Sequence, residues 1–391
     1  MFNFDTIIDR RNTDSYKWDC TAETFGTNDV LPMWVADMDF ACPPPLLDAL
    51  EARIRHGILG YTSRSEGYEQ AIVSWLARRH GWQVDRNWIS YCPPGIMPSV
   101  CMLVELLSQP NDKIIIQTPN YSSLMNAIKD SGRLMVENPL KFDGQGYIFD
   151  FNDLRAKISS NAKILLLCNP NNPTGAVWGR DQLMELGDIC AKNGIFVISD
   201  EVHCDLVYPG SRHTPFGSLP GLTREMSATC ISPNKTFNVG GLLTSTIIMP
   251  NQILKERYEA ELATQQIRLD NVFGRIAVET LYKDPLCEQW LEELLVYLEG
   301  NIDTAVTRIN AIPGLTVCKP QGTYLLWIDF SGLGLTDTAL RRMLVSRAKL
   351  GLSDGLDFGS RFGQYMRMNI ACPRQTLEEG LRRLEQACGA M

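Results

Sequence analysis

The chain of 391 residues lacks the patterns that mark metal-bound, disulfide-bonded and membrane proteins. Its twelve cysteines stand singly without a Cys-x-x-Cys pair, and it has only four histidines, so we expect no metal site and no disulfide framework. No apolar run approaches the ~20 residues that cross a bilayer, and the N-terminus lacks the pattern of a signal peptide. We therefore expect a cytoplasmic protein that does not contact a membrane.

Positive charge is also scarce. The formal net charge is -8 and the isoelectric point is near 5.2, whereas a nucleic-acid binder needs basic surface for the phosphates. The sequence has no Gly-x-Gly-x-x-Gly after an early strand and no Gly-x-x-x-x-Gly-Lys-[Ser/Thr] motif. These absences exclude a nucleic-acid partner, a nicotinamide oxidoreductase and a phosphate-loop nucleotidase.

Between about residues 81 and 250, short apolar runs alternate with helical segments. The runs lie at residues 114–116, 164–167, 195–198 and 229–231, and residues 182–193 are typical of the intervening helices. Continuous apolar strands separated by helices indicate a sheet covered on both faces, hence mostly parallel. We predict an α/β large domain with a mostly parallel sheet, and a smaller C-terminal α+β domain.

The domain boundaries follow from changes in this pattern. Residues 1–45 are turn-rich and are predicted to form an arm that joins the small domain, residues 46–285 the large domain, and residues 286–391 the small domain. Within them we expect helices at 46–54, 68–80, 281–308, 336–349 and from 376, and strands at 315–317, 324–328 and 367–370. Asp284-Pro285 interrupts the long segment.

Polar segments of an unusual kind follow the four apolar runs. They are Thr-Pro-Asn-Tyr at 118–121, Asn-Pro-Asn-Asn-Pro-Thr-Gly at 169–175, Ser-Asp-Glu-Val-His at 199–203 and Ser-Pro-Asn-Lys at 232–235. Each one alone is also ordinary turn or helix-cap chemistry. Ligands of an open parallel sheet bind beyond the carboxyl ends of its strands. We therefore expect an aromatic, an amide, a carboxylate and an amine to meet at one edge.

A phosphorylated pyridine aldehyde needs this set of groups. Asp200 can keep the ring nitrogen protonated, and Tyr121 can stack on the ring. Asn172 can donate to the phenolate oxygen, and Lys235 can supply the amine for the aldehyde. The neighbouring His203 is added to the expected cofactor-binding residues.

The phosphate of such a cofactor has a predicted place at residues 94–99. Gly95, beside Ile96, allows a close approach of the backbone, and the apolar helix expected to follow at residues 100–107 offers free N–H groups and the positive end of its dipole. Ser232 could add a hydroxyl.

Taken together, these motifs resemble the fold-type I pyridoxal-phosphate enzymes, the aspartate aminotransferase superfamily, over essentially the whole chain. The resemblance rests on residues 169–175, Asp200 and Lys235. Arg367, within Arg-Met-Asn, matches the arginine that members use to hold the substrate α-carboxylate, and a guanidinium fork suits that group. Pyridoxal 5'-phosphate is thus the implied cofactor, and an amino acid the implied substrate.

A narrower resemblance is to the cystathionine β-lyase and cysteine-sulfur lyase branch of the class I/II aminotransferases. It rests on residues 33–40, Gly60-Tyr61, residues 235–238 and residues 371–374. It implies that the backbone at Val35 and Ala36 lies beside the substrate carboxylate. It also implies a homodimer in which Tyr61 reaches the partner's phosphate.

Two positions depart from the family pattern. Leu243 stands where aspartate aminotransferases carry a phosphate-binding arginine, and Asn234 precedes the lysine where many relatives have serine. Phosphate binding is therefore expected to depend on the helix N-terminus, Ser232 and the partner's Tyr61.

The expected function is a carbon–sulfur β-lyase that converts cystathionine or cysteine to pyruvate, ammonia and a thiol. An aminotransferase is the alternative, because both reactions use the same groups and differ in where Lys235 returns its proton. A non-catalytic regulator that keeps the fold is a third reading, although such proteins tend to lose the lysine or the aspartate. Tyr61, or else Tyr121, is a hypothetical acid for the departing sulfur.

Overall fold

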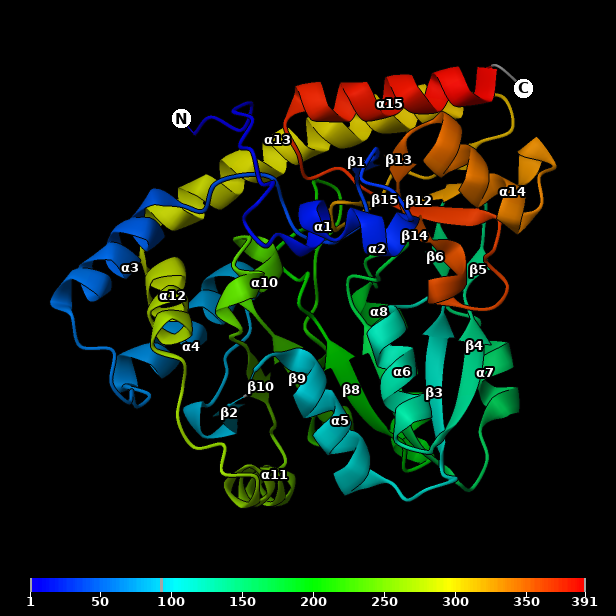
Figure 1. Cartoon of the computed structure of the whole chain (residues 1–391). Helices are drawn as coiled ribbons and strands as arrows, with labels where there is room; N and C mark the ends of the chain where they lie inside the picture. Colours follow the sequence, from blue (N-terminus) through cyan, green and yellow to red (C-terminus); the bar gives the residue numbers. More distant parts are fainter. Residues whose placement is uncertain (1, 92–93, 390–391) are drawn as a thin grey trace.

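The computed structural model describes residues 2–91 and 94–389, and a seven-stranded sheet forms its centre (Figure 1). The spatial order is β2-β10-β9-β8-β7-β3-β4. The strands are β2 (Ile89–Tyr91), β3 (Lys113–Thr118), β4 (Leu134–Pro139), β7 (Ala162–Cys168), β8 (Phe196–Asp200), β9 (Ser227–Ile231) and β10 (Thr246–Ile248). All neighbours pair in parallel except β10, which is antiparallel to β9 and β2. The prediction of a mostly parallel sheet with strands at the four apolar runs is confirmed.

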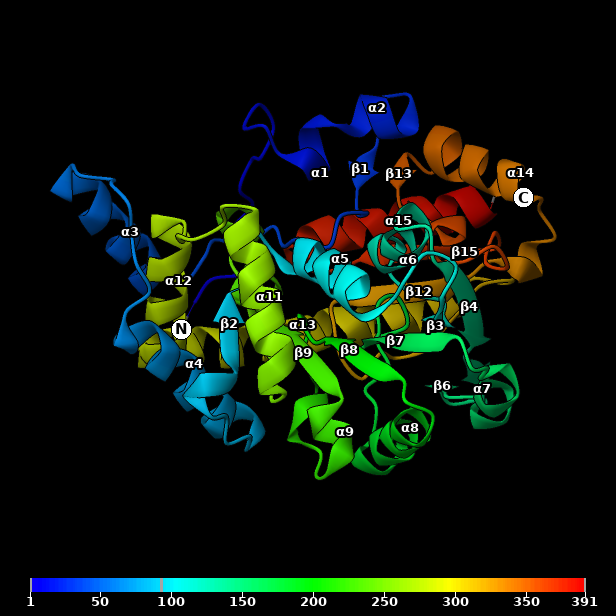
Figure 2. The ribbon, with the colours of Figure 1, turned by 90° about the horizontal axis from the view of Figure 1, so that it is seen from below.

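Helices cover both faces of this sheet, as Figure 2 shows. One face packs against α5 (Ile96–Leu107), α6 (Ser122–Asp130) and α11 (Gln252–Thr264), and the other against α7 (Phe151–Lys157) and α8 (Arg180–Lys192). Along β3, Ile114 and Ile116 join the first apolar cluster and Ile115 joins the second. This alternation is the period of two of a strand with two buried faces.

The predicted helix ends are set by glycine and proline. The helices α3 (Pro44–His56) and α4 (Glu66–His80) end at Gly57 and Gly81, whose φ angles of 80° and 66° favour glycine. The segment expected at 281–308 is divided: α12 (Val272–Lys283) stops, Asp284 caps the next helix, and α13 (Pro285–Asn310) follows. Proline fits the first turn of α13 because that turn needs no N–H from it.

The C-terminal part contains a second sheet. It has the order β11 (Thr316–Val317), β12 (Leu325–Asp329), β15 (Tyr365–Asn369) and β14 (Ser353–Asp354), all antiparallel, and α15 (Arg374–Gly389) lies along α13 (Figure 1). The helix expected at 336–349 is shorter than predicted. It consists of α14 (Asp337–Arg342) and a π-helical turn over Met343–Arg347, and it is followed by β13 (Leu350–Gly351).

The N-terminal segment lies on this C-terminal part. Its strand β1 (Leu31–Pro32) pairs in parallel with β13. The division into an arm, a large domain and a small domain at residues 45/46 and 285/286 stays a prediction. The remaining elements are α1 (Tyr16–Asp19), α2 (Thr21–Phe25), β5 (Lys141–Phe142), β6 (Tyr147–Ile148), α9 (Leu222–Glu225) and α10 (Pro233–Thr236), together with short 3-10 turns.

A buried ion network fixes the N-terminal segment where it enters the centre of the molecule. Lys17, which is 1% exposed, places Nζ 2.7 Å from Asp39, and Arg10 binds Asp39 at 2.7 Å and Asp37 at 2.5 Å. Trp18 also donates to Asp39. Charges are tolerated in such a place only when they are paired, so the network specifies one position for residues 37–39.

Two of the absences expected from the sequence can be compared with the structure. No helix in the described part of the chain is long and apolar enough to cross a membrane. The eleven cysteines within residues 2–91 and 94–389 are all free, and most are buried.

A buried amide helps to tie the long helix α13 to the C-terminal part. Asn301 is fully buried, and its Nδ2 donates to the carbonyls of Ile370 and Cys372 at 2.9 Å each. In an Asn301→Ala variant both carbonyls lose their donor, and we expect the free energy of unfolding to fall by about 2–4 kcal/mol. Urea titration of the variant measures this change. Val296→Ala, a change at a 73% exposed position on the same helix, should leave the midpoint almost unchanged, and equal effects would contradict the assignment.

Candidate active site

A cavity of about 310 Å³ lies beyond the carboxyl ends of β3, β7, β8 and β9. Residues 34–36 and Arg367 on β15 line it from the other side. Most of the predicted site residues come together here: Val35, Ala36, Tyr121, Asn172, Asp200, His203, Lys235 and Arg367. The parallel strands therefore place the polar segments at one edge, as the sequence predicts.

Asp200 is the last residue of β8 and is 5% exposed. Its Oδ1 accepts a hydrogen bond from the N–H of Val202 at 3.2 Å, and no ion pair joins it to another described residue. Burial raises the pKa of this carboxyl group to about 6. A buried carboxylate at a cavity wall favours a ligand that brings a cationic N–H to it, as a protonated pyridine does.

Lys235 lies in the single-turn helix α10, which Ser232 caps by accepting from the N–H of Asn234. Its Nζ donates to the carbonyl of Ala36 at 2.7 Å. Burial lowers the pKa of the ammonium group, and the nearby Arg367 adds to this effect while the carboxylates of Asp37 and Asp200 oppose it. The neutral amine, which is the nucleophile and base, is thereby easier to form than for a solvated lysine.

Arg367 is 6% exposed and is held by oxygen atoms on three sides. Its guanidinium donates to Asn172 Oδ1 at 2.9 Å, to the carbonyl of Trp34 at 2.6 Å and to Ser353 Oγ at 3.1 Å. The cation also lies 5.0 Å from the centre of the Phe358 ring. Burial lowers its pKa to about 10, so it stays charged at neutral pH. Its Nε has no partner among the described residues, which suits an anionic ligand.

His203 and Tyr121 complete the wall. Burial lowers the pKa of His203 well below its ordinary value, so the imidazole is neutral, and its Nδ1 has no partner in the described part of the chain. Its ring meets Tyr324 edge to face at 5.9 Å. Tyr121 precedes the first residue of α6, so the start of that helix carries the ring to the cavity.

Comparison with known proteins agrees with this geometry. Residues 28–384 match the family model for aminotransferase class I and II. The chain belongs to this family.

Among curated relatives, cystathionine beta-lyase PatB of Bacillus subtilis is 38% identical over 98% of this chain and 99% of its own. A PLP-bound aminotransferase-like protein from Clostridium difficile 630 has a TM-score of 0.96 and 42% identity, covering 99% and 100% of the two chains. Cystalysin from Treponema denticola, solved with pyridoxal 5'-phosphate, has a TM-score of 0.95 and 32% identity, covering 100% and 99%.

Three residues that were expected to bind the cofactor phosphate, Gly95, Ile96 and Ser232, are not among the residues that line this cavity. Gly95 caps α5 with a φ of 151°, a conformation suited to glycine, and Ile96 is the first residue of that helix. The hydroxyl of Ser232 donates to the carbonyl of Thr244 at 2.7 Å. A phosphate contact from Ser232 needs this hydroxyl to turn, and it stays a prediction, as do those of Gly95 and Ile96.

Tyr61 is the one predicted catalytic residue that the fold of a single chain does not bring to the cavity. Its side chain is 97% exposed, and the adjacent Thr62 forms an isolated bridge with Asp270. A role for Tyr61 in the active site therefore requires a second copy of the chain. The sequence resemblance implies the same arrangement.

Several cavity residues escaped the sequence prediction. They are Tyr16, Trp34, Ser122, Ser123, Cys168, Val202, Ser353, Asp357 and Phe358. Trp34 lies in the quoted segment at 33–40, and Cys168 ends β7 directly before the segment at 169–175. Residues 353–358 belong to no motif and are placed by the β14 and β15 pairing and by the contacts of Ser353 with Trp34 and Arg367.

The segment at residues 34–38 is held by the amides of Asn238, which follows α10, and Asn369, which ends β15, and by the phenol of Tyr324. Asn238 binds the N–H and the carbonyl of Met38, and Asn369 donates to the carbonyls on either side of Ala36. The hydroxyl of Tyr324 shares the Ala36 carbonyl with Lys235 at 2.9 Å. These contacts fix the oxygen that positions the lysine amine.

The buried Asp200 carboxylate should destabilise the cofactor-free chain above pH 6. The folded-state pKa of about 6 exceeds the ordinary value of 3.8, so the folded state holds its proton more tightly and loses stability as pH rises between these values. Asp200→Asn removes that cost. We expect the cofactor-free variant to be more stable than the cofactor-free native chain by up to about 3 kcal/mol at pH 7.5, and by almost nothing below pH 4.

Urea unfolding at pH 4 and pH 7.5 measures this difference. Asp188→Asn, a change at an exposed position of the outer helix α8, is the matched control and should keep the stability of the native chain at both pH values. A native chain that gains stability between pH 4 and pH 6.5 relative to Asp200→Asn would contradict the raised pKa.

Proposed function

We propose that this protein is a pyridoxal-phosphate-dependent carbon–sulfur β-lyase that releases a thiol, pyruvate and ammonia from a sulfur-containing amino acid. The observation that carries the proposal is the meeting of buried Asp200 and Arg367 with half-buried Lys235 in one cavity. The 38% identity to a cystathionine β-lyase over nearly the full length supports the choice of reaction.

The residues of the cavity fit the cofactor. Asp200 would pair with the protonated ring nitrogen, Lys235 would bind the aldehyde carbon, and Asn172 would face the phenolate oxygen. Tyr121 would lie against the ring. When bound, the cofactor acts as an electron sink that stabilises negative charge at the substrate Cα.

The remaining groups suit an amino-acid substrate. Arg367 is a cation at neutral pH with an unpartnered Nε, so its fork can hold the α-carboxylate beside the backbone of Val35 and Ala36. Lys235, with its lowered pKa, can take the proton from Cα and hold it near the Ala36 carbonyl. Loss of the Cα proton allows the Cβ–S bond to break with the thiolate as leaving group.

An aminotransferase is the second candidate. The same cavity supports it, and the similar chain from Clostridium difficile is named for that activity. The two reactions separate after the Cα proton is removed: a lyase breaks the Cβ–S bond, whereas in an aminotransferase Lys235 returns the proton to the cofactor side. A non-catalytic regulator is disfavoured, because Lys235 and Asp200 are both present and both line the cavity.

A homodimer belongs to the proposal, as does the cytoplasmic location expected from the sequence. Exposed apolar side chains lie close to Tyr61 in the sequence, Ile58 and Leu59, and on two other loops, Leu243 and Leu269. The Thr62 bridge to Asp270 and the bond from Asn271 to the Leu242 carbonyl bring these loops together. Contiguous exposed apolar residues mark an interaction surface.

The reaction type is tested with cystathionine and cysteine, each with and without a keto-acid acceptor. A lyase releases pyruvate and thiol without the acceptor, and we expect this result. The measurement is coupled pyruvate detection together with thiol titration. Amino transfer that depends on the acceptor, with no thiol released in its absence, would replace the lyase assignment by the aminotransferase.

The cross-subunit role of Tyr61 is tested by combining two variants. Lys235→Ala removes the amine and should abolish turnover together with the visible absorbance that depends on it, and Tyr61→Phe should lower turnover. A heterodimer of the two, isolated through different tags, contains one site with both native residues and should regain about half of the native activity. If Tyr61 acts within its own chain, the heterodimer shows no recovery. Full turnover in Tyr61→Phe alone would remove the hypothesis that Tyr61 protonates the sulfur.

A further inference from the structure

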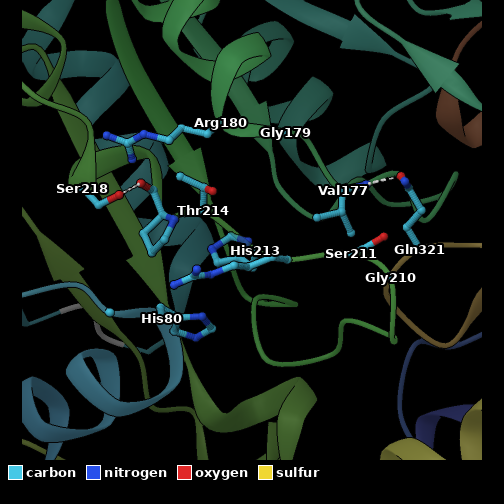
Figure 3. A pocket seen from close by; sticks show the side chains of 13 residues that line it. His80, Val177, Gly179, Arg180, Gly210, Ser211, His213, Thr214, Ser218 and Gln321 are labelled. Atoms are coloured by element: carbon cyan, nitrogen blue, oxygen red, sulfur yellow. Dashed lines mark hydrogen bonds between the residues drawn. The ribbon is translucent and has the colours of Figure 1, made fainter.

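A second cavity, of about 590 Å³, shares no lining residue with the active cavity and is shown from close by in Figure 3. It is lined by the end of α4, the start of α8, residues 210–218 and Gln321. Among the described residues, the ionisable side chains that line it are Arg180, Arg212, His80 and His213. No Asp or Glu of the described part lines it. We propose that this cavity binds a small polyanion. We also propose that the bound anion changes the electrostatic environment of Asp200 and Lys235.

The two arginines are available to an anion. Both are exposed, and neither forms an ion pair with another residue of the described part. Arg180 is the first residue of the thirteen-residue helix α8, so the positive end of the helix dipole lies at the same wall. The Arg212 guanidinium lies over Gly81, where a Cβ would approach its Nη2 to 3.4 Å. Two guanidinium groups at one cavity suit a phosphate or a polycarboxylate.

The two histidines lie side by side with their ring centres 5.1 Å apart (Figure 3). His213 is 4% exposed, its Nε2 is 2.9 Å from Glu201, and its Nδ1 has no partner among the described residues. His80 has its Nε2 2.9 Å from Asp205. Each imidazole therefore stands between the positively charged cavity and one buried carboxylate.

Each of these two carboxylates is connected to a residue of the active cavity. Glu201 directly follows Asp200 and also binds Ser199 and the N–H of Phe216. Asp205 accepts a hydrogen bond from Thr236, the residue after Lys235, at 2.9 Å. An anion beside the imidazoles favours their cationic form, and the charge of an imidazolium is felt by carboxylates in a low-dielectric interior. This second step rests on the proposed function, whereas the binding itself does not.

Binding is tested on the cofactor-saturated protein by calorimetry with two probes, pyrophosphate and citrate. We expect one site per chain with a dissociation constant below about 1 mM for at least one probe. The stronger probe tells whether phosphate or carboxylate chemistry is preferred. An Arg180→Gln/Arg212→Gln variant should weaken binding at least about tenfold. Arg342→Gln, which removes an exposed arginine of α14, is the matched control and should bind like the native chain.

Coupling is tested by adding to the same samples the probe that was found to bind and recording the visible absorbance of the cofactor. The band should shift in the native chain and in Arg342→Gln, and stay unchanged in the double variant. Without a probe, the double variant should keep native lyase turnover, since its two changes are exposed and outside the active cavity.

Absence of heat with both probes, or undiminished binding in the double variant, would overturn the proposed site. Binding without an absorbance change would overturn its coupling to Asp200 and Lys235. If the protein proves not to be a lyase, calorimetry still decides the anion site by itself.

Discussion

The burial of one carboxylate at the end of a central strand is the constraint on which the active cavity depends. Asp200 ends β8 between β7 and β9, and its neighbours in register are Cys168 and Cys230. Burial raises its pKa to about 6 because the interior stabilises the charge poorly. A cationic ring nitrogen brought by a ligand would reverse that cost. The fold therefore holds in the ligand-free chain an unfavourable charge that becomes favourable when the cofactor binds.

Burial also disfavours the charged forms of Lys235 and Arg367, which are cations where Asp200 is an anion. Burial lowers the pKa of both groups, and the nearby Arg367 lowers that of Lys235 further. Carbonyl oxygens at Trp34 and Ala36 hold the two cations in the absence of an anionic ligand. An amino acid offers a carboxylate to one and, with the cofactor, a reaction centre to the other. The ligand-free geometry is thus complementary to the charges that a substrate complex would bring.

The sequence predicts this arrangement as far as local patterns reach. Asp200, Asn172 and Lys235 follow apolar runs, and the parallel sheet brings strand ends together. The short antiparallel β10 was not predicted, because three residues carry no period. The hydrogen bonds that hold residues 34–38 in place could not be predicted either. Asn238 and Asn369 contact that segment from 200 and 334 residues away in the sequence, and their amides look like ordinary polar residues there.

The phosphate end of the site leads to a different conclusion from the ring end. Within one chain, the expected phosphate region offers the N-terminus of α5 at Gly95 and Ile96, and the position of a family arginine is Leu243, which is 53% exposed. The hydroxyl of Ser232 is engaged with Thr244, and Tyr61 points into solvent beside exposed apolar residues. A dianion held only by a helix N-terminus is weakly neutralised. The departure at Leu243 therefore leaves the phosphate end as the part of the site that the proposed dimer contact of Tyr61 would have to complete.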